Sequence, residues 1–324
     1  MKEHLFSIEK RTKSFVSALA VLSLLSVICF AVIVHNEKRT LAAERVLAKQ
    51  TDHFESVALE AKSAFVLDVV NNKVLYSKNP NQPLPLASLT KVMTAITTKE
   101  SVKEDSPIII TRDYLTPDGD SGFVPGEKWK VADLLDFTLL TSSNDGAKAL
   151  AAASAISVFG NQAEGEKGEK LFVSLMNEKA TKIGLSNSRF FNEHGLDRSM
   201  DKGGAYGSAE DMARLFEYAI INHSGLLDAT KYDLLGFLSN QKSYLGTNTN
   251  KFVDSVPNLI ASKTGFTDLA GGNLVIVFDP GLNRPIIVSV LGSTEDGRFN
   301  DVLKLVEATM KTIVQESSVE ENTN

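Results

Sequence analysis

The chain has 324 residues, of which 43% are hydrophobic and 23% are charged, an ordinary composition for a globular protein. This length leaves room for one large domain or two small ones. The formal net charge is −6, and no run of lysine or arginine is long enough to form a track for nucleic acid, which is therefore not an expected partner.

Cysteine and histidine usage argues against a disulfide or a metal centre. The one cysteine, Cys29, lies inside an apolar run, so no intrachain disulfide can form and no cysteine cluster is available. A lipid attachment at Cys29 is disfavoured because bulky residues precede it. The five histidines are scattered and include no HExxH spacing. We therefore expect neither a metal nor a cofactor.

The first expected element is an apolar segment over residues 14–34, which carries no charge and follows Lys10, Arg11 and Lys13. As a helix it would span about 30 Å, the thickness of the bilayer core. A cleaved signal peptide is the alternative, but the run is long and lacks a small-x-small cleavage site at its end. We expect a cytoplasmic N-terminus over 1–13 and an uncleaved transmembrane anchor over 14–34. Basic residues flank both ends, so charge leaves the orientation open.

The next segment, residues 35–58, is polar, with apolar residues at loosely helical spacing. This pattern is typical of a helical stalk or of a disordered linker. A globular domain is expected over residues 59–315, beginning near Ala61. The acidic segment 316–324 is expected to be a disordered tail.

Strand patterns occur at both ends of this domain, and helical patterns lie between them. Residues 64–69 and 73–76 read as a hairpin around Asn71-Asn72, and strands are expected again at 273–278 and 285–291. Helical spacing is found at 89–98, 131–140, 147–159, 170–183, 209–221 and 299–314. This order predicts an α+β fold, in which one antiparallel sheet built from both chain ends is flanked by helices and carries an inserted, mostly helical subdomain.

The first motif with chemical meaning is Ser88-Leu89-Thr90-Lys91, at the expected start of a helix. Positions i and i+3 share a helix face, so the lysine amine can reach the serine hydroxyl. A serine becomes a nucleophile when a base takes its proton, and a helix N-terminus offers N–H groups to an oxyanion. The spacing alone is weak, because four such matches occur in the chain and a surface helix pair explains any single one.

Two further motifs follow in the chain, and the second of them occurs only once. Ser142-Ser143-Asn144 follows a probable helix and places a hydroxyl and an amide in a turn, although a helix cap is the plainer interpretation. Lys263-Thr264-Gly265 reads as a strand in which lysine and threonine can bind a carboxylate and glycine allows close backbone approach. By itself, this motif fits a solvent-exposed edge strand equally well.

The three motifs in this order are the signature of class A β-lactamases and penicillin-binding proteins. From about Ala61 to Met310 the sequence resembles the low-molecular-mass penicillin-binding proteins, the serine-type D-alanyl-D-alanine carboxypeptidases of peptidase family S11. The asparagine–x–histidine–glycine–leucine stretch at 192–196 and the serine–alanine–x–aspartate–methionine stretch at 208–212 are the most family-specific parts. The resemblance implies the penicillin-binding-protein fold and removal of the terminal D-alanine from peptidoglycan stem pentapeptides.

The resemblance also implies a catalytic role for four residues. Ser88 would be the acylated nucleophile and Lys91 its base, which requires a lowered pKa. Ser142 would pass a proton to the departing amine, and Asn144 would orient the substrate and Lys91. No cofactor is implied.

The same resemblance assigns substrate binding to the third motif and its neighbour. Lys263 and Thr264 would hold the terminal carboxylate, Gly265 belongs to the same strand, and the N–H groups of Ser88 and Phe266 would form the oxyanion hole. The peptide would add to this strand as a further β-strand. β-Lactams would act as covalent inhibitors by mimicking D-alanyl-D-alanine.

The chain departs from the family in two places. Residues 204–207 (Gly-Ala-Tyr-Gly) stand where relatives often carry a histidine, which bears on the local loop more than on the chemistry. Many relatives continue into a C-terminal β-domain with an amphipathic membrane helix, which we do not expect here. The N-terminal helix is expected to tether the chain to the membrane instead. The substrate lies outside the cytoplasm, so the resemblance implies a single-pass cell-membrane protein with an extracytoplasmic catalytic domain.

Three other functions stay open from the sequence. A DD-endopeptidase cutting peptidoglycan crosslinks would carry the same motifs. A class A-like β-lactamase would need a glutamate–x–x–leucine–asparagine stretch, which does not occur between Asn144 and Lys263. A non-catalytic penicillin-binding sensor fits poorly with intact Ser88, Lys91 and Lys263. His194 could be a base, but a histidine that orders its loop through backbone hydrogen bonds is the favoured interpretation.

Overall fold

The computed structural model describes residues 23, 25–38, 52–115, 121–163, 165–281 and 283–321. One compact unit spans His53–Ile313. Phe54 belongs to its core, since this side chain is 7% exposed and stacks on Tyr76 with ring centroids 5.4 Å apart. The compact unit therefore begins before the predicted boundary at residue 59, because Phe54 and Val57 pack into the core on one face of the sheet.

The predicted anchor over 14–34 lies largely outside the described residues, as do 1–13 and 39–51 of the predicted N-terminus and stalk. Residues 25–38 are helical. In the parts of the chain that the structure describes, no helix is both long enough and apolar enough to cross a bilayer.

The main sheet has five antiparallel strands in the order β10-β11-β12-β1-β2. Its strands come from both ends of the compact unit: β1 (Ser63–Asp68), β2 (Lys73–Lys78), β10 (Leu259–Thr267), β11 (Gly271–Phe278) and β12 (Ile286–Ser293). The pairing of β1 with β12 joins the two ends of the chain, which confirms the predicted α+β architecture. β10 lies at the edge of the sheet.

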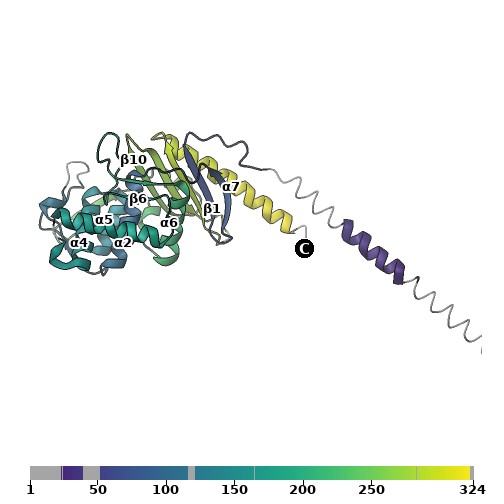
Figure 1. Ribbon diagram of the computed structural model, residues 1–324, viewed down its shortest axis with the longest axis horizontal. Helices are drawn as coiled ribbons and strands as arrows, with labels where there is room; N and C mark the ends of the chain where they lie inside the picture. The colour runs from purple at the N-terminus through teal and green to yellow at the C-terminus, as the bar shows by residue number, and fades with distance from the viewer. Residues whose placement is uncertain are drawn as a thin grey trace, which may run out of the picture. The chain divides into compact units, whose positions relative to one another are not determined.

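The two faces of the sheet enter two separate cores, as the alternation of side chains in a strand requires. On β1, Phe65 and Leu67 face one core, whereas Ala64 and Val66 face the other. The second core is closed by Phe54 and by the apolar side of α7 (Gly297–Glu321), including Phe299. Figure 1 shows α7 alongside β1, with α2, α4, α5 and α6 on the other side of the sheet.

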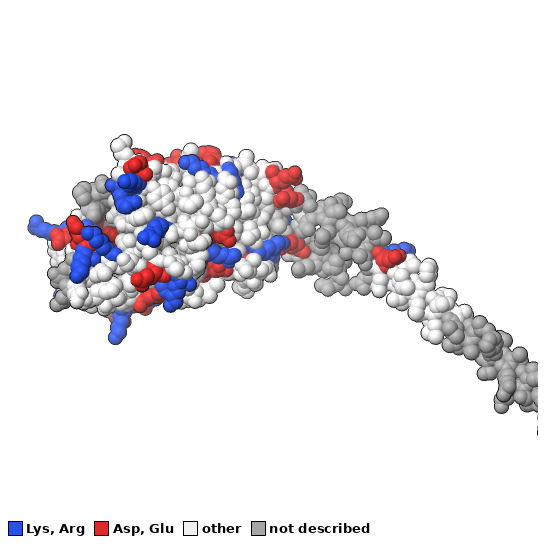
Figure 2. Space-filling view, in the orientation of Figure 1, with Lys and Arg blue, Asp and Glu red and all other residues white. Residues whose placement is uncertain are grey.

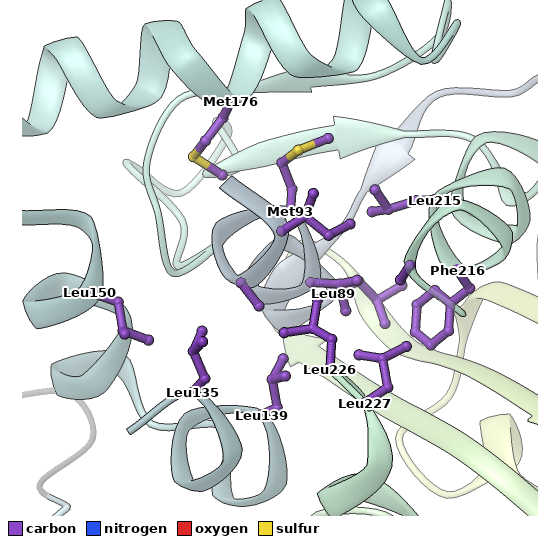
Figure 3. Packing of buried hydrophobic residues seen from close by; sticks show 14 of the residues in the cluster. Leu89, Met93, Leu135, Leu139, Leu150, Met176, Leu215, Phe216, Leu226 and Leu227 are labelled. Carbon is purple, nitrogen blue, oxygen red and sulfur yellow. The ribbon is translucent and has the colours of Figure 1, made fainter. Parts of the chain in front are cut away.

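The helical subdomain surrounds α2 (Thr90–Ser101), the helix that begins directly after the serine–x–x–lysine serine. Every residue of α2 from Thr90 to Thr98 is buried. Figure 3 shows Leu89 and Met93 among leucines and Met176 of the surrounding helices. These helices are α3 (Val131–Thr141), α4 (Asn144–Phe159), α5 (Gly165–Lys182) and α6 (Ala209–Asn222). α6 also packs against β1 and β12, which ties the subdomain to the sheet.

Smaller elements complete the compact unit. Three short strands form one small sheet, in the order β3 (Leu84–Pro85), β7 (Ala205–Gly207) and β6 (Arg189–Phe190). Two hairpins pair β4 (Pro107–Ile109) with β5 (Lys128–Lys130), and β8 (Leu234–Leu238) with β9 (Ser243–Thr247). Single 3₁₀ turns lie at η1 (Ala87–Leu89), η2 (Arg112–Tyr114), η3 (Gly160–Gln162), η4 (Asp228–Lys231) and η5 (Val253–Ser255).

The C-terminal helix is longer than the sequence pattern indicated. α7 runs to Glu321, so the disordered tail expected from residue 316 was wrong for 316–321, and 322–324 lie outside the described residues. Polar side chains do not end a helix when its backbone groups remain paired, and Ser318 Oγ donates to the carbonyl of Val314 within the helix (2.9 Å).

Charged side chains of both signs are interspersed on the molecular face seen in Figure 2. Lysine and arginine alternate there with aspartate and glutamate over the helical subdomain. This distribution fits the net charge of −6 and offers no basic stripe on that face for nucleic acid.

Candidate active site

Ser88 lies in η1, at the point where the chain leaves the small sheet and enters α2. Asn273 of β11 holds this approach by donating from Nδ2 to the carbonyls of Pro85 (3.0 Å) and Leu86 (3.1 Å). Ala87 has a φ of 48°, a left-handed conformation that is unfavourable for an alanine. Such a residue persists where its surroundings hold it, and strained backbone of this kind is concentrated at functional sites.

Lys91 is fully buried, and its Nζ atom has three oxygen partners. It lies 2.9 Å from Ser88 Oγ, 2.7 Å from Asn144 Oδ1 and 2.7 Å from the carbonyl oxygen of His194. An exposed helix-surface pair, the plain interpretation of the serine–x–x–lysine spacing, is therefore wrong for this position. A neutral amine has two hydrogens and one lone pair. If the hydrogens go to the two carbonyl-type oxygens, the lone pair is left for the Ser88 hydroxyl.

Burial lowers the pKa of Lys91 from 10.5 to about 7, and the nearby Glu193 carboxylate opposes this shift only in part. The charged ammonium loses its hydration inside the protein, which favours the neutral amine. A substantial fraction of Lys91 is thus uncharged near neutral pH and able to take a proton from Ser88.

The second motif occupies the break between α3 and α4. Ser142 ends α3 in a left-handed conformation with φ 63°, and Asn144 is the first residue of α4. Between them, Ser143 caps α4 by accepting from the N–H of Gly146 (2.9 Å). The helix-cap interpretation is confirmed for Ser143, while Ser142 and Asn144 contact Lys263 and Lys91, as the catalytic hypothesis requires.

The third motif lies in β10, with the lysine and threonine side chains buried. Lys263 Nζ donates to Ser142 Oγ (2.9 Å), which joins the sheet to the helical subdomain. Burial and the nearby cations Lys91 and Arg298 hold the pKa of Lys263 well below its ordinary value. Thr264 Oγ1 lies 2.6 Å from Thr249 Oγ1, so the two hydroxyls share one hydrogen bond. One of their two hydrogens remains for a ligand.

Gly265 allows η1 and β10 to approach each other closely. A Cβ atom added to Gly265 would lie 2.7 Å from the carbonyl oxygen of Leu86 and 3.2 Å from the Ser88 nitrogen. The β10 backbone therefore runs beside the N–H of Ser88, the arrangement required if the N–H of Phe266 is to share an oxyanion with it. The Phe266 side chain is 42% exposed.

The seven predicted residues Ser88, Lys91, Ser142, Asn144, Lys263, Thr264 and Gly265 thus lie in one place, joined by the contacts given above. Phe266 follows them on the same strand. Within the described ranges, no group of three or more histidine, cysteine, aspartate or glutamate side chains is arranged to hold a metal.

Sequence reasoning did not identify the backbone partner of Lys91, the carbonyl of His194. The loop before it is shaped by Asn192, whose side chain bonds both Gly195 N (2.7 Å) and Leu196 O (2.8 Å). Gly195 lies so close to Ala87 that no Cβ would fit. The family-specific stretch at 192–196 marks this loop in the sequence. Its side chains suggest a role for the residues themselves, whereas the contact with Lys91 is made by a backbone carbonyl.

The His194 ring orders this loop, because its Nδ1 accepts from the N–H of Leu196 (3.1 Å). Burial lowers the pKa of His194 to about 3, and the cations Lys91 and Lys148 act in the same direction. The ring is therefore neutral at ordinary pH. This geometry agrees with the loop-ordering interpretation and gives no support to a general base.

Two further residues of the site carry no short sequence motif. Asn273 anchors the segment before Ser88, and Arg298 of α7 donates from NH1 to the carbonyl of Gly265 (3.0 Å). Arg298 is 6% exposed, and its Nε–H finds no hydrogen-bond partner among the residues that the structure describes. A buried guanidinium with a spare donor beside Lys263 adds positive potential where a carboxylate is expected to bind.

Comparisons with known proteins agree with this geometry. A family model described as D-alanyl-D-alanine carboxypeptidase, Peptidase_S11, matches residues 48–295. The chain is 32% identical over 276 residues to D-alanyl-D-alanine carboxypeptidase DacF of Bacillus subtilis, covering 82% of this chain and 66% of DacF. It is 30% identical over 240 residues to the D-alanyl-D-alanine endopeptidase of Escherichia coli K12, covering 71% of this chain and 70% of that protein.

The fold has a counterpart among solved structures. The structure of penicillin-binding protein D2 from Listeria monocytogenes in its ampicillin-bound form superposes with a TM-score of 0.66 at 28% identity, covering 78% of this chain and 98% of that one. The chain spans just under two thirds of the length of DacF. With its three motifs assembled in one site and a family model matching most of its length, the chain belongs to the Peptidase_S11 family of D-alanyl-D-alanine carboxypeptidases.

Proposed function

We propose that this protein is a serine DD-carboxypeptidase that removes the terminal D-alanine from peptidoglycan stem pentapeptides through an acyl-enzyme on Ser88. The observation that carries the proposal is the environment of Lys91. Its amine is buried, has a pKa of about 7 and lies 2.9 Å from Ser88 Oγ. Its two other contacts occupy both N–H bonds of the neutral form, so its lone pair is aimed at the nucleophile.

Substrate binding would prepare this base further. The C-terminal carboxylate of the peptide would lie beside Lys263, Thr264 and the spare hydroxyl hydrogen of the threonine pair. A bound carboxylate raises the pKa of Lys263 and keeps it charged, and a charged Lys263 in turn disfavours a second charge on Lys91. The carboxylate would thereby favour the neutral Lys91 that acylation needs.

Acylation and hydrolysis follow from the same contacts. Lys91 takes the Ser88 proton while Ser88 Oγ forms a bond to the carbonyl carbon, and the N–H groups of Ser88 and Phe266 stabilise the oxyanion. The C–N bond breaks as the D-alanine nitrogen receives a proton through Ser142, whose hydroxyl accepts from Lys263, so that the proton that Lys91 took from Ser88 is balanced by the one that leaves with the amine. Water then cleaves the ester and restores Ser88. A β-lactam would acylate Ser88 by the same route and act as a covalent inhibitor.

The location of the substrate suggests where the protein works. Peptidoglycan lies outside the cytoplasm, and residues 14–34 are uncharged over a length that suits a bilayer. We infer a single-pass cell-membrane protein whose catalytic domain is extracytoplasmic. This is tested by treating intact cells with a protease added from outside, using a chain that carries an epitope at each end. We expect the protease to remove the catalytic domain and its epitope, and to leave the N-terminal epitope protected.

The activity test uses the full chain in detergent and a stem pentapeptide ending in D-alanyl-D-alanine. Free D-alanine is measured beside a Ser88→Ala variant. Release by the native chain and none by the variant is expected. If neither D-alanine release nor labelling of Ser88 by a fluorescent penicillin occurs, the mechanism is wrong.

DD-endopeptidase activity is the second candidate, favoured by the 30% identity to the Escherichia coli endopeptidase, of which this chain covers a larger share than of DacF. The chemistry would be the same, with a crosslinked peptide in place of the pentapeptide. A crosslinked stem-peptide dimer and the monomeric pentapeptide, supplied together to the enzyme, separate the two activities. Faster loss of the dimer would favour the endopeptidase.

A further inference from the structure

A short segment, residues 121–127, lies between the serine–x–asparagine motif and the β8–β9 hairpin and contacts both. We call it the bridge segment. Its first residue touches the serine–x–asparagine motif, and the rest is fastened to the β8–β9 hairpin. The bridge segment carries no recognised motif, and nothing in its sequence indicates a role in the site.

At one end, Ser121 contacts both residues that flank Asn144. Its hydroxyl lies 2.5 Å from Ser143 Oγ, and its backbone N–H donates to Asp145 Oδ2 (3.2 Å). Ser143 and Asp145 are both buried. Ser121 therefore forms hydrogen bonds with the two residues on either side of Asn144, whose side-chain oxygen accepts from Lys91.

This first turn follows a strained break in the chain. The chain breaks between α3 and α4, and Ser142 adopts a left-handed conformation that an L-residue other than glycine seldom holds without help. The cap from Ser143 to Gly146 N lies within α4 and does not fix α4 relative to its surroundings. The Ser121 contacts do, because they come from a different part of the chain.

The bridge segment is itself firmly placed. The carbonyl of Gly122 accepts from Lys242 Nζ (2.7 Å) and from Tyr244 OH (3.1 Å), both on or next to β9. Phe123 packs against Trp129, Phe137 and Tyr244 at centroid distances of 5.2 to 5.6 Å.

At its far end, the buried carboxylate of Glu127 accepts from the N–H of Val124 (3.1 Å) and from Tyr244 OH (2.5 Å). The hairpin then continues to Thr249, which contacts Thr264 of β10. Hydrogen bonds, together with the backbone of residues 121–122 and 244–249, therefore connect the serine–x–asparagine turn to the substrate-binding strand.

We propose that Ser121 is a positioning residue. Through its hydrogen bonds with Ser143 and Asp145 it fixes the position of Asn144, and Asn144 in turn holds the amine of Lys91 within hydrogen-bond distance of Ser88. Ser121 acts on the step that requires Lys91 as base, the acylation of Ser88. Its effect on substrate binding, which depends on Lys263 and Thr264, is expected to be smaller. The proposal rests on the function given above, because it concerns the rate of that reaction.

The test compares single-turnover acylation by a fluorescent penicillin with steady-state D-alanine release, both expressed per site labelled after long exposure. Counting only sites that can be labelled removes any unfolded fraction. Ser121→Ala is expected to slow acylation about tenfold while KM changes less than about twofold. Ser121→Thr retains the hydroxyl and should acylate within about twofold of the native rate.

The matched control is Ser157→Ala, which removes a hydroxyl at the other end of α4. Ser157 Oγ donates to the carbonyl of Ser101 (2.7 Å), so this variant also loses one bond between elements. Native acylation is expected. A double-mutant cycle with Ser143→Ala adds a second readout: if Ser121 works through Ser143, the double variant should be no slower than Ser143→Ala.

The results separate this inference from the proposed function. A native chain that releases D-alanine while Ser121→Ala acylates at the native rate would overturn the positioning role alone. Losses that multiply in the cycle would also overturn it. If Ser121→Ala yields no labelled sites, Ser121→Cys decides: it keeps the size but weakens the hydrogen bond, and native acylation in that variant would contradict the proposal.

Discussion

At the scale of single residues, the active site depends on two buried lysines, and in the described part of the chain no carboxylate is hydrogen-bonded to either of them. Lys91 and Lys263 are each at most 2% exposed, and their hydrogen-bond partners are hydroxyls, an amide oxygen and backbone carbonyls. Neutral acceptors satisfy the N–H groups without supplying the negative charge that would hold an ammonium at high pKa. The surroundings thus turn one lysine into a base, and a substrate carboxylate would be needed to keep the other charged.

The first prediction concerns pH. The neutral form of Lys91 is required for acylation, and its pKa is about 7, so the acylation rate should rise as pH increases through that value and level off above it. Rates of Ser88 labelling by a fluorescent penicillin between pH 5 and 9 measure this directly. A rate that is flat across the range, or that falls from pH 6 to 8, would contradict the assignment of Lys91 as the base.

The second prediction concerns Thr249, which shares a hydrogen bond with Thr264. Thr249→Val keeps the shape but removes the hydroxyl, so Thr264 must find another partner and its orientation toward a carboxylate is less restricted. We expect KM for the pentapeptide to rise about tenfold with a smaller change in kcat, corresponding to the loss of roughly one hydrogen bond. Thr249→Ser retains the hydroxyl and serves as the control. An unchanged KM in Thr249→Val would show that the pair plays no part in binding.

At the scale of elements, the site exists because three close approaches bring the starts of helices against a strand, a loop and another helix. Gly265 lets β10 lie against η1, Gly195 lets the 192–196 loop lie against Ala87, and Gly146 fits α4 against α3. At each of these glycines a Cβ would fall within 2.7 Å of another atom. Replacing the glycine would push apart two elements that each carry part of the chemistry.

The third prediction follows from the contact between Gly265 and Leu86. Gly265→Ala places a methyl group 2.7 Å from the backbone oxygen of Leu86, which has no flexible end to move aside. We expect a loss of about 1–3 kcal/mol in the free energy of unfolding, as is usual for overpacking, and a large fall in the rate of Ser88 acylation.

Gly236→Ala on β8 is the control for this variant, since its added Cβ would meet nothing within 4 Å. Chemical denaturation and penicillin labelling of both variants provide the comparison. Equal behaviour of the two variants would mean that η1 and β10 are free to separate.

At the scale of the whole molecule, the sheet closes the catalytic unit by pairing its beginning with its end. Every residue of β1 pairs with β12, and Asp301 of α7 accepts from the backbone N–H of Ala61 at the start of the unit (2.8 Å). Contacts between residues so far apart in the chain form only when the whole unit folds, so we expect the unit to unfold cooperatively.

The fourth prediction tests where this unit begins. Phe54 is buried against Tyr76, so Phe54→Ala should lower the free energy of unfolding by about 3 kcal/mol, whereas Val70→Ala, at an exposed position, should change it little. Thermal or chemical denaturation measures both, and kcat per labelled site should stay native in each. If the two variants are equally stable, residue 54 belongs to a linker after all.

The sequence by itself determined the family, the α+β class, the helices from 89 to 221 and most of the site. It did so because the serine and lysine of the first motif share one helix turn and because helix and strand periodicities are local properties of the chain. The order of the three motifs then identified the candidate residues without any knowledge of their contacts.

The tertiary structure decided what local patterns do not encode. The carbonyl of His194, the side chains of Asn273 and Arg298, and the grip of Ser121 on α4 act through contacts between segments far apart in the chain, and no spacing rule marks them. The β8–β9 hairpin and the packing of Phe54 escaped detection for the same reason. The pKa of Lys91 is likewise a property of burial, which only the folded chain creates.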